Sequence, residues 1–326
     1  MKLPDRGAGE VAGCNSGAAW RTLRSLILLS AALCSLLPGA LLAAPRSKPV
    51  IVPAQSYSGA RLVHKANPHG IPLPEPDAIG RYQPFVFPVA IAATANELYV
   101  ADVGLGAVFR YNLALDVMLP LAGSLVQPQT RLALAADGSL LVAQGGSAPA
   151  QLYPRSGRPP QQVRSPMGGV AFDELVGDPV SGRLYGLDRV QQRLEEMLPN
   201  GRGNAVFSVG QLPEQPYALT TDGQALYVAG RSCQCVYAVD LFGLRQSQVL
   251  ANDFTAITAM AANNGWLVIA DGGDRNLRIY KDGLLRADSA YGALNLTNPQ
   301  SLSIVNNMLY VADPAAARIQ SFRLWP

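Results

Sequence analysis

Four aspartates are the residues of this sequence whose repeated setting first suggests chemistry. Asp102, Asp188, Asp271 and Asp313 each close a short apolar run and precede small or polar residues. Carboxylates that converge can bind a divalent cation. An aspartate at the end of a strand can instead accept backbone N–H groups and fix the turn that follows. Because each aspartate belongs to a different copy of a repeat, the four cannot meet at one ion, and we expect them to fix turns.

Cysteine and histidine give little material for a catalytic or metal site. Cys233 and Cys235 are separated by one residue, so either a local disulfide in an oxidising compartment or two free thiols fits them. A thiolate metal site would need further soft ligands. The two histidines of the chain, His64 and His69, precede the repeats, so no histidine base is available within them. We therefore expect no bound metal and no cofactor.

Six copies of a repeat position these residues. The same apolar phrase ends at 102, 144, 188, 230, 271 and 313, at intervals of 42, 44, 42, 41 and 42 residues. Its copies are Leu98–Asp102, Leu140–Gln144, Leu184–Asp188, Leu226–Gly230, Leu267–Asp271 and Leu309–Asp313. A period of this size fits four short strands with their turns, which is one blade of a β-propeller. The sequence thus predicts an all-β, six-bladed propeller of four-stranded blades.

The residue pattern of the repeat resembles that of the NHL-repeat family. Pro88–Ala92 followed by Leu98–Asp102, and Asn298–Leu302 followed by Leu309–Asp313 and Arg318–Phe322, are similar to its strand–turn–strand phrase. Arg275–Tyr280 is similar to its third strand. The resemblance covers residues 85–326 and implies the six-bladed ring that this family shares with TolB-like and SMP-30-like proteins.

The last repeat lacks a fourth strand, because the chain stops at Trp325-Pro326 directly after the third. A strand from before the first repeat must complete it, since a closed ring leaves no open edge. We expect Tyr82–Phe87, or residues just before, to pair with Arg318–Leu324. Residues 44–80 contain seven prolines between Pro45 and Pro76 and are predicted to form an N-terminal arm, with the propeller at 81–326.

The first strand of each blade lines the central channel of such a ring. The family resemblance places a small residue there, and it matches Ala90, Gly169, Ala218, Ala259 and Ser301, with Arg131 in the second blade. We expect Arg131 to point into the channel and to be paired, hydrated or bound to an anionic ligand, because an unpaired buried charge is costly. Further candidate ligand-binding residues at the channel mouth are Tyr217, Glu214, Asn298 and Gln300.

Related metal-dependent lactonases place Glu, Asn and Asp side chains at this mouth. Glu214 and Asn298 are the rough equivalents in this sequence, which is few ligands for a divalent cation. We therefore expect a non-catalytic binding or scaffold protein that presents one propeller face to a protein or glycan partner. The alternative is a metal-dependent lactonase or hydrolase.

Residues 1–43 have the order of a secretory signal peptide. Arg21 and Arg24 precede a long uncharged stretch rich in Leu and Ala, which ends in small residues suited to cleavage after Ala43. A single-span membrane anchor is the alternative. Cleavage leaves 22 basic and 21 acidic residues, a net charge of +1, which indicates no nucleic-acid partner. The mature chain is expected to be periplasmic or secreted and to have no membrane span.

Overall fold

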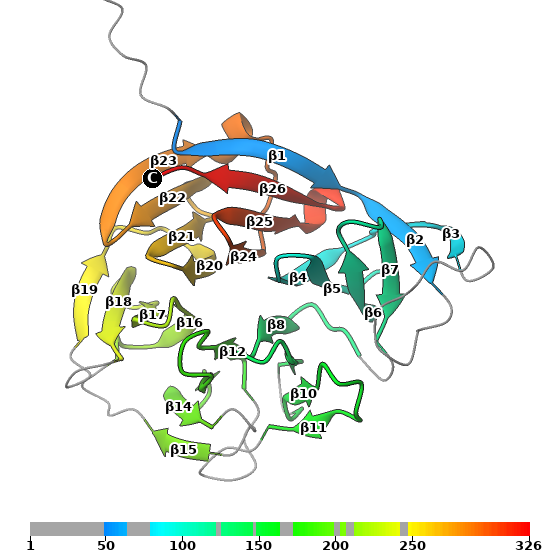
Figure 1. The fold of residues 1–326 in the computed structure, drawn as a ribbon. Coiled ribbons are helices and arrows are strands. Elements are labelled where there is room, and N and C mark those ends of the chain that lie inside the picture. Colours follow the sequence, from blue (N-terminus) through cyan, green and yellow to red (C-terminus); the bar gives the residue numbers. More distant parts are fainter. Residues whose placement is uncertain are drawn as a thin grey trace, which may run out of the picture. The chain divides into compact units, whose positions relative to one another are not determined.

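The computed structural model describes residues 49–63, 79–121, 125–145, 148–163, 172–198, 203–206, 212–241 and 247–326. The unit formed by Pro49–Pro326 is a six-bladed β-propeller whose blades are β-sheets, as the repeat predicts (Figure 1). The signal-peptide prediction for residues 1–43 falls outside the described residues. Among the residues that are described, no helix is long and apolar enough to cross a bilayer.

Each blade follows the chain outwards from an inner strand. Blade one holds β4 (Pro88–Ala93), β5 (Glu97–Asp102), β6 (Ala107–Asn112) and β7 (Val117–Pro120). Blade two holds β8 (Arg131–Leu134), β9 (Leu140–Ala143), β10 (Gln151–Tyr153) and β11 (Gln161–Gln162). Blade three holds β12 (Glu174–Gly177), β13 (Leu184–Asp188), β14 (Arg193–Met197) and β15 (Gly203–Val206).

The second half of the ring repeats this order. Blade four holds β16 (Pro216–Thr221), β17 (Ala225–Gly230), β18 (Cys235–Asp240) and β19 (Ser247–Ala251). Blade five holds β20 (Ile257–Asn263), β21 (Trp266–Asp271), β22 (Asn276–Lys281) and β23 (Leu284–Ala290). Blade six holds β24 (Ser301–Val305), β25 (Met308–Asp313) and β26 (Arg318–Leu324). The six apolar phrases of the sequence are the second strands of the six blades.

The strand that closes the ring comes from the N-terminal side, but the predicted segment was wrong. β1 (Ile51–Tyr57) pairs antiparallel with β26, from Ile51 opposite Leu324 to Tyr57 opposite Ile319 (Figure 1). Most of the predicted segment Tyr82–Phe87 lies instead in and after β3 (Ile79–Pro84). β3 pairs with β2 (Gly59–Val63), which lies parallel to β7, so blade one has six strands. The closing strand therefore lies within the stretch 44–80 that the sequence suggested as an arm.

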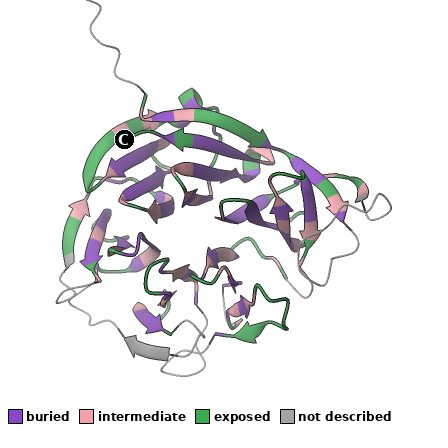
Figure 2. Cartoon of the chain, viewed as in Figure 1, coloured by how far each residue is buried: buried purple, intermediate pink, exposed green. Residues whose placement is uncertain are grey.

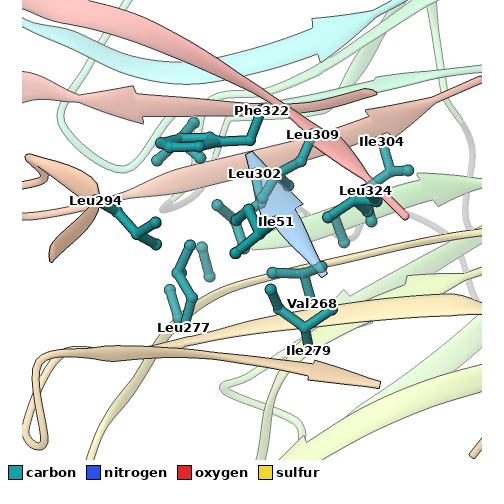
Figure 3. Packing of buried hydrophobic residues seen from close by; sticks show 14 of the residues in the cluster. Ile51, Val268, Leu277, Ile279, Leu294, Leu302, Ile304, Leu309, Phe322 and Leu324 are labelled. Carbon is teal, nitrogen blue, oxygen red and sulfur yellow. The ribbon is translucent and has the colours of Figure 1, made fainter. Parts of the chain in front are cut away.

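The core lies between neighbouring blades, so their middle strands are buried on both faces. All residues of β5 and of β21 are buried, whereas β23 is mostly exposed (Figure 2). In the seam between blades five and six, Ile51 of β1 packs with Val268 and Phe322 (Figure 3). Burial of one such side chain contributes about 1.5–3 kcal/mol, so β1 stabilises the ring through its side chains as well as its hydrogen bonds.

Candidate functional site

The inner strands of the six blades surround a cavity of about 440 Å³. This volume is within the range of small-molecule sites, about 300–1,000 Å³. Much of its wall consists of Ala, Leu, Ser and Thr side chains, and its charged lining residues are Arg131, Asp137, Arg155 and Glu174. Several hydroxyl groups on this wall are used by the fold: Ile91 and Ala93 donate their backbone N–H groups to Ser301 Oγ and Ser303 Oγ, at 3.1 and 3.0 Å. These bonds join the inner strands of blades six and one.

Strand pairing fixes which inner-strand residues are equivalent. In each blade, one inner-strand residue pairs with the last residue but one of the apolar phrase. From blade one to blade six these inner-strand residues are Ala90, Arg131, Glu174, Ala218, Ala259 and Ser301. Arg131 therefore occupies the channel position that the sequence predicts. The prediction of Gly169 for blade three was wrong, because Glu174 holds that position opposite Leu187. Gly169, which lies outside the described residues, matched only by its small size, and size does not determine strand register.

Arg131 and Glu174 form an ion pair across the seam between blades two and three. Arg131 Nε lies 3.0 Å from Glu174 Oε1, and Arg131 Nη1 donates to the backbone oxygen of Thr130. Arg189 joins them from the loop after β13, with Nη2 2.6 Å from the same Glu174 oxygen and Nε donating to the backbone oxygen of Tyr217. One carboxylate thus holds two guanidinium groups, and the cluster links blades two, three and four.

Of the other predicted mouth residues, Tyr217 lies in β16, and Glu214, Asn298 and Gln300 lie in the segments that lead into blades four and six. Tyr217 is half-buried, and the Arg231 guanidinium lies over its ring at 5.2 Å from the centroid. Burial raises the pKa of Tyr217, against smaller opposing effects of a backbone hydrogen bond and nearby arginines. Gln300 Nε2 donates to Asn298 Oδ1 at 3.1 Å.

Glu214 and Asn298 are exposed, and blade five separates their two blades. Within the part of the chain that the structure describes, no three His, Cys, Asp or Glu side chains are grouped as metal ligands would be. His64 and His69 fall outside that part.

The repeated aspartates fix loops, as the sequence predicts. Asp271 Oδ2 and Oδ1 accept the N–H groups of Thr255 and Ala256, both at 2.9 Å. Asp102 accepts those of Val86 and Phe87, and Asp313 accepts those of Thr297 and Asn298. Burial alone would raise the pKa of Asp271, but these backbone donors and those of Asp274 and Gly273 lower it below its ordinary value. Asp102, Asp271 and Asp313 thereby fix the segments that lead into their own blades, whereas Asp188 accepts the N–H group of Gln191 in the loop that follows it, at 2.9 Å.

Blade four departs from this pattern. Gly230 replaces the aspartate, and Cys233 and Cys235 form a disulfide in the loop between β17 and β18. The loop retains the backbone bond that other blades have at this place, here from Arg231 N to Gln215 O at 3.1 Å. Two residues at the channel were missed by sequence reasoning, Glu174 and Arg189. Glu174 lies 14 residues before Asp188, whereas the equivalent residue of the other blades lies 12 or 13 before the end of its phrase, so counting along the sequence misses it by one or two positions.

Comparison with known proteins shows the fold alone. No family profile matches the sequence, and no curated protein matches it. A solved structure described as a "putative gluconolactonase" is similar, with TM-score 0.54, 12% identity, and coverage of 74% of this chain and 89% of that one. A chain of the nidogen/laminin complex has TM-score 0.56 and 14% identity, covering 76% and 97%. Virginiamycin B lyase from Staphylococcus aureus has TM-score 0.53 and 10% identity, covering 74% and 96%. These neighbours include a binding protein and enzymes, and the likeness does not decide between the two roles.

Proposed function

We propose that this chain is an exported, non-catalytic propeller of the NHL-repeat type that binds a partner through the face around the channel mouth. The NHL-like phrases of the sequence coincide with the first, second and third strands of the blades, which supports this family. Export rests on the signal-like order of residues 1–43.

The observation that carries the proposal is that the inner-strand carboxylate at the channel mouth is already paired with arginines. Glu174 is the carboxylate at the inner-strand position, and it is bound by Arg131 and Arg189. A metal-dependent hydrolase needs carboxylates that are free to bind the ion and converge on it. Here the carboxylate instead joins neighbouring blades, which favours a binding surface over a hydrolytic centre.

The same face carries exposed apolar side chains next to arginine and tyrosine. Val190, in the loop after β13, is 84% exposed, and Val86 and Phe87 are exposed in the segment that enters blade one. Tyr217 and Arg231 stack at the entry to blade four. Aromatic residues and arginine are enriched at protein interfaces, so a protein partner is favoured, and a glycan is the other outcome of the test.

The catalytic alternative is tested with purified protein, a sugar lactone and an aryl ester, with and without Ca²⁺, Zn²⁺ or Mn²⁺. We expect hydrolysis at the background rate in every case. Metal-dependent lactone hydrolysis that disappears in Glu214→Ala or Asn298→Ala would overturn the proposal and establish the hydrolase.

The binding role is tested by matched substitutions on one blade. Val190→Asp lies on the mouth face, whereas Val180→Asp lies in the loop between β12 and β13 on the opposite face, where Val180 is 64% exposed. In a cross-linking experiment that captures the partner, we expect Val190→Asp to abolish the cross-linked product and Val180→Asp to leave its amount unchanged. A glycan array that binds the protein with the same dependence on Val190 would identify the partner as a glycan. Equal effects of the two substitutions would contradict the choice of face.

A further inference from the structure

The disulfide of blade four occupies the place of a carboxylate. Gly230 is the equivalent of Asp102 and Asp271, because each of the three pairs with the first residue of the inner strand of its blade. A Cβ atom at residue 230 would lie 2.8 Å from Cys233 Sγ and 2.4 Å from Pro213 Cβ. An aspartate therefore does not fit there, and the sulfur of Cys233 packs beside the position at which four other blades carry an aspartate and blade two carries Gln144.

The turn that contains the disulfide forms in other blades without one. Blade four and four other blades have a residue with positive φ four positions after the end of the second-strand phrase. These residues are Gly106, Gln192, Gln234, Arg275 and Ala317, with φ from 49° to 69°. This left-handed residue lies between the two cysteines as Gln234. Because the same backbone conformation occurs elsewhere without a disulfide, the dithiol form of blade four is compatible with the folded ring.

The two cysteine residues are unequally exposed. Cys233 is exposed at the surface of the loop, whereas Cys235 begins β18 and is only 2% exposed. A thiolate reacts with a disulfide by approaching one sulfur, so access decides which sulfur is attacked. Accessible disulfides that add little to a fold are the ones that thiols reduce readily.

From these observations we propose that Cys233–Cys235 is a thiol–disulfide exchange site on the mouth face, open to small thiols and exposed dithiols. An incoming thiolate attacks Cys233 Sγ, the S–S bond breaks, and its electron pair leaves on Cys235 Sγ, which takes up a proton. A second thiolate then attacks the incoming sulfur of the mixed disulfide and releases Cys233 as a thiol. Two external thiols are oxidised to one disulfide, and the protein disulfide is reduced to two thiols.

The exchange site is linked to the surroundings of the mouth. Phe254 N, in the segment that enters blade five, donates to Gln234 O at 3.1 Å. Arg231, which stacks on Tyr217, lies two residues before Cys233. The disulfide therefore lies in a loop that contacts the segments entering blades four and five. This inference does not depend on the partner-binding role, since thiol reactivity is measured without a partner.

The first test is reduction of the native full chain by millimolar glutathione, followed by alkylation and mass analysis of the tryptic peptide 232–245, which contains both cysteines. We expect glutathione to reduce the disulfide in the folded protein, with far-UV circular dichroism unchanged, so that both cysteines are alkylated when the reduced protein is then unfolded for labelling. The proposal is overturned if the peptide stays oxidised until urea unfolds the protein, because the disulfide is then protected by the fold.

The second test compares two matched variants. Cys235→Ser leaves the exposed Cys233 thiol, and Cys233→Ser leaves the buried Cys235 thiol. With glutathione disulfide as the probe, we expect the first to form a mixed disulfide in peptide 232–245 at least about tenfold faster than the second. Equal rates, or faster reaction of Cys233→Ser, would show that attack is not directed to Cys233.

Discussion

At the scale of single residues, the Asp271 carboxylate accepts backbone N–H groups from two loops of blade five. Besides the N–H groups of Thr255 and Ala256, its Oδ1 accepts those of Gly273 and Asp274, at 3.1 and 3.4 Å. The side chain is fully buried. Because these donors favour the ionised form and outweigh the burial that opposes it, the pKa of Asp271 is lower in the folded protein than in the unfolded chain.

We predict that Asp271→Asn lowers the free energy of unfolding by about 3 kcal/mol at pH 7, because the neutral amide accepts fewer N–H bonds. Because the pKa of Asp271 is lower in the folded protein, its carboxylate stabilises the fold fully at pH values above the pKa of an aspartate in the unfolded chain, about 4. That stabilisation is lost as pH falls through the folded-state pKa. Urea unfolding of the wild type and of Asp271→Asn should therefore show that the difference between their free energies of unfolding decreases from pH 7 to pH 3. Asp282→Asn, at an exposed turn, is the control and should change stability by less than about 0.5 kcal/mol.

The cluster at the channel mouth predicts unequal costs for its two partners. Arg131→Ala leaves Glu174 paired with Arg189, so we expect a loss of no more than about 1 kcal/mol and an intact fold. Glu174→Ala leaves two guanidinium groups without their carboxylate, so we expect a loss of about 2–3 kcal/mol. Chemical denaturation measures both. An Arg131→Ala protein that fails to fold would contradict this account of the cluster.

At the scale of elements, β1 is the strand on which closure of blade six depends. It pairs with the six residues Ile319–Leu324 of β26 and buries Ile51 and Tyr57 in the seams on its two sides. Without β1, the backbone N–H and C=O groups of β26 form an open edge, which is a template for aggregation.

Two truncated chains test this role. We expect a chain that starts at residue 49 to melt near the temperature of the full chain. A chain that starts at residue 58 lacks β1 but keeps β2 and β3, and it should melt well below it or aggregate. Thermal melting and size-exclusion chromatography measure both. If the shorter chain is a monomer with unchanged melting temperature, β1 does not close the ring.

At the scale of the whole molecule, the ring joins the two ends of the described chain. Val52 in β1 faces Arg323 in β26, although most of the chain lies between them. Contacts of such sequence separation carry a large loop-closure entropy in the unfolded state. A covalent link at this place should therefore stabilise the ring as a unit.

We predict that a disulfide in the double variant Val52→Cys/Arg323→Cys raises the free energy of unfolding by about 3–5 kcal/mol relative to its own reduced form. Neither residue is fully buried, so the substitutions should leave the seam intact. Wild-type protein with and without reductant provides the correction for Cys233–Cys235. If oxidation raises the free energy of unfolding of the double variant no more than it does for the wild type, β1 and β26 are not held in this register.

The sequence by itself determined the number of blades, their second strands and the role of the repeated aspartates. These features are local: a period of about 42 residues and an aspartate before a turn act within one blade. Arg131, which the sequence singled out, lies opposite Ala143 in its blade, and ligand binding by it stays a prediction.

Only the tertiary structure decided which strand closes the ring and what Arg131 contacts. Ile51–Tyr57 is a strand because β26 offers it hydrogen bonds and two apolar seams, and neither is visible in its own residues. Glu174 meets Arg131 43 residues away, because pairing within each sheet sets both at the same level of the channel. Contacts between blades depend on strand register and on the closed ring, and both arise from packing of the whole chain.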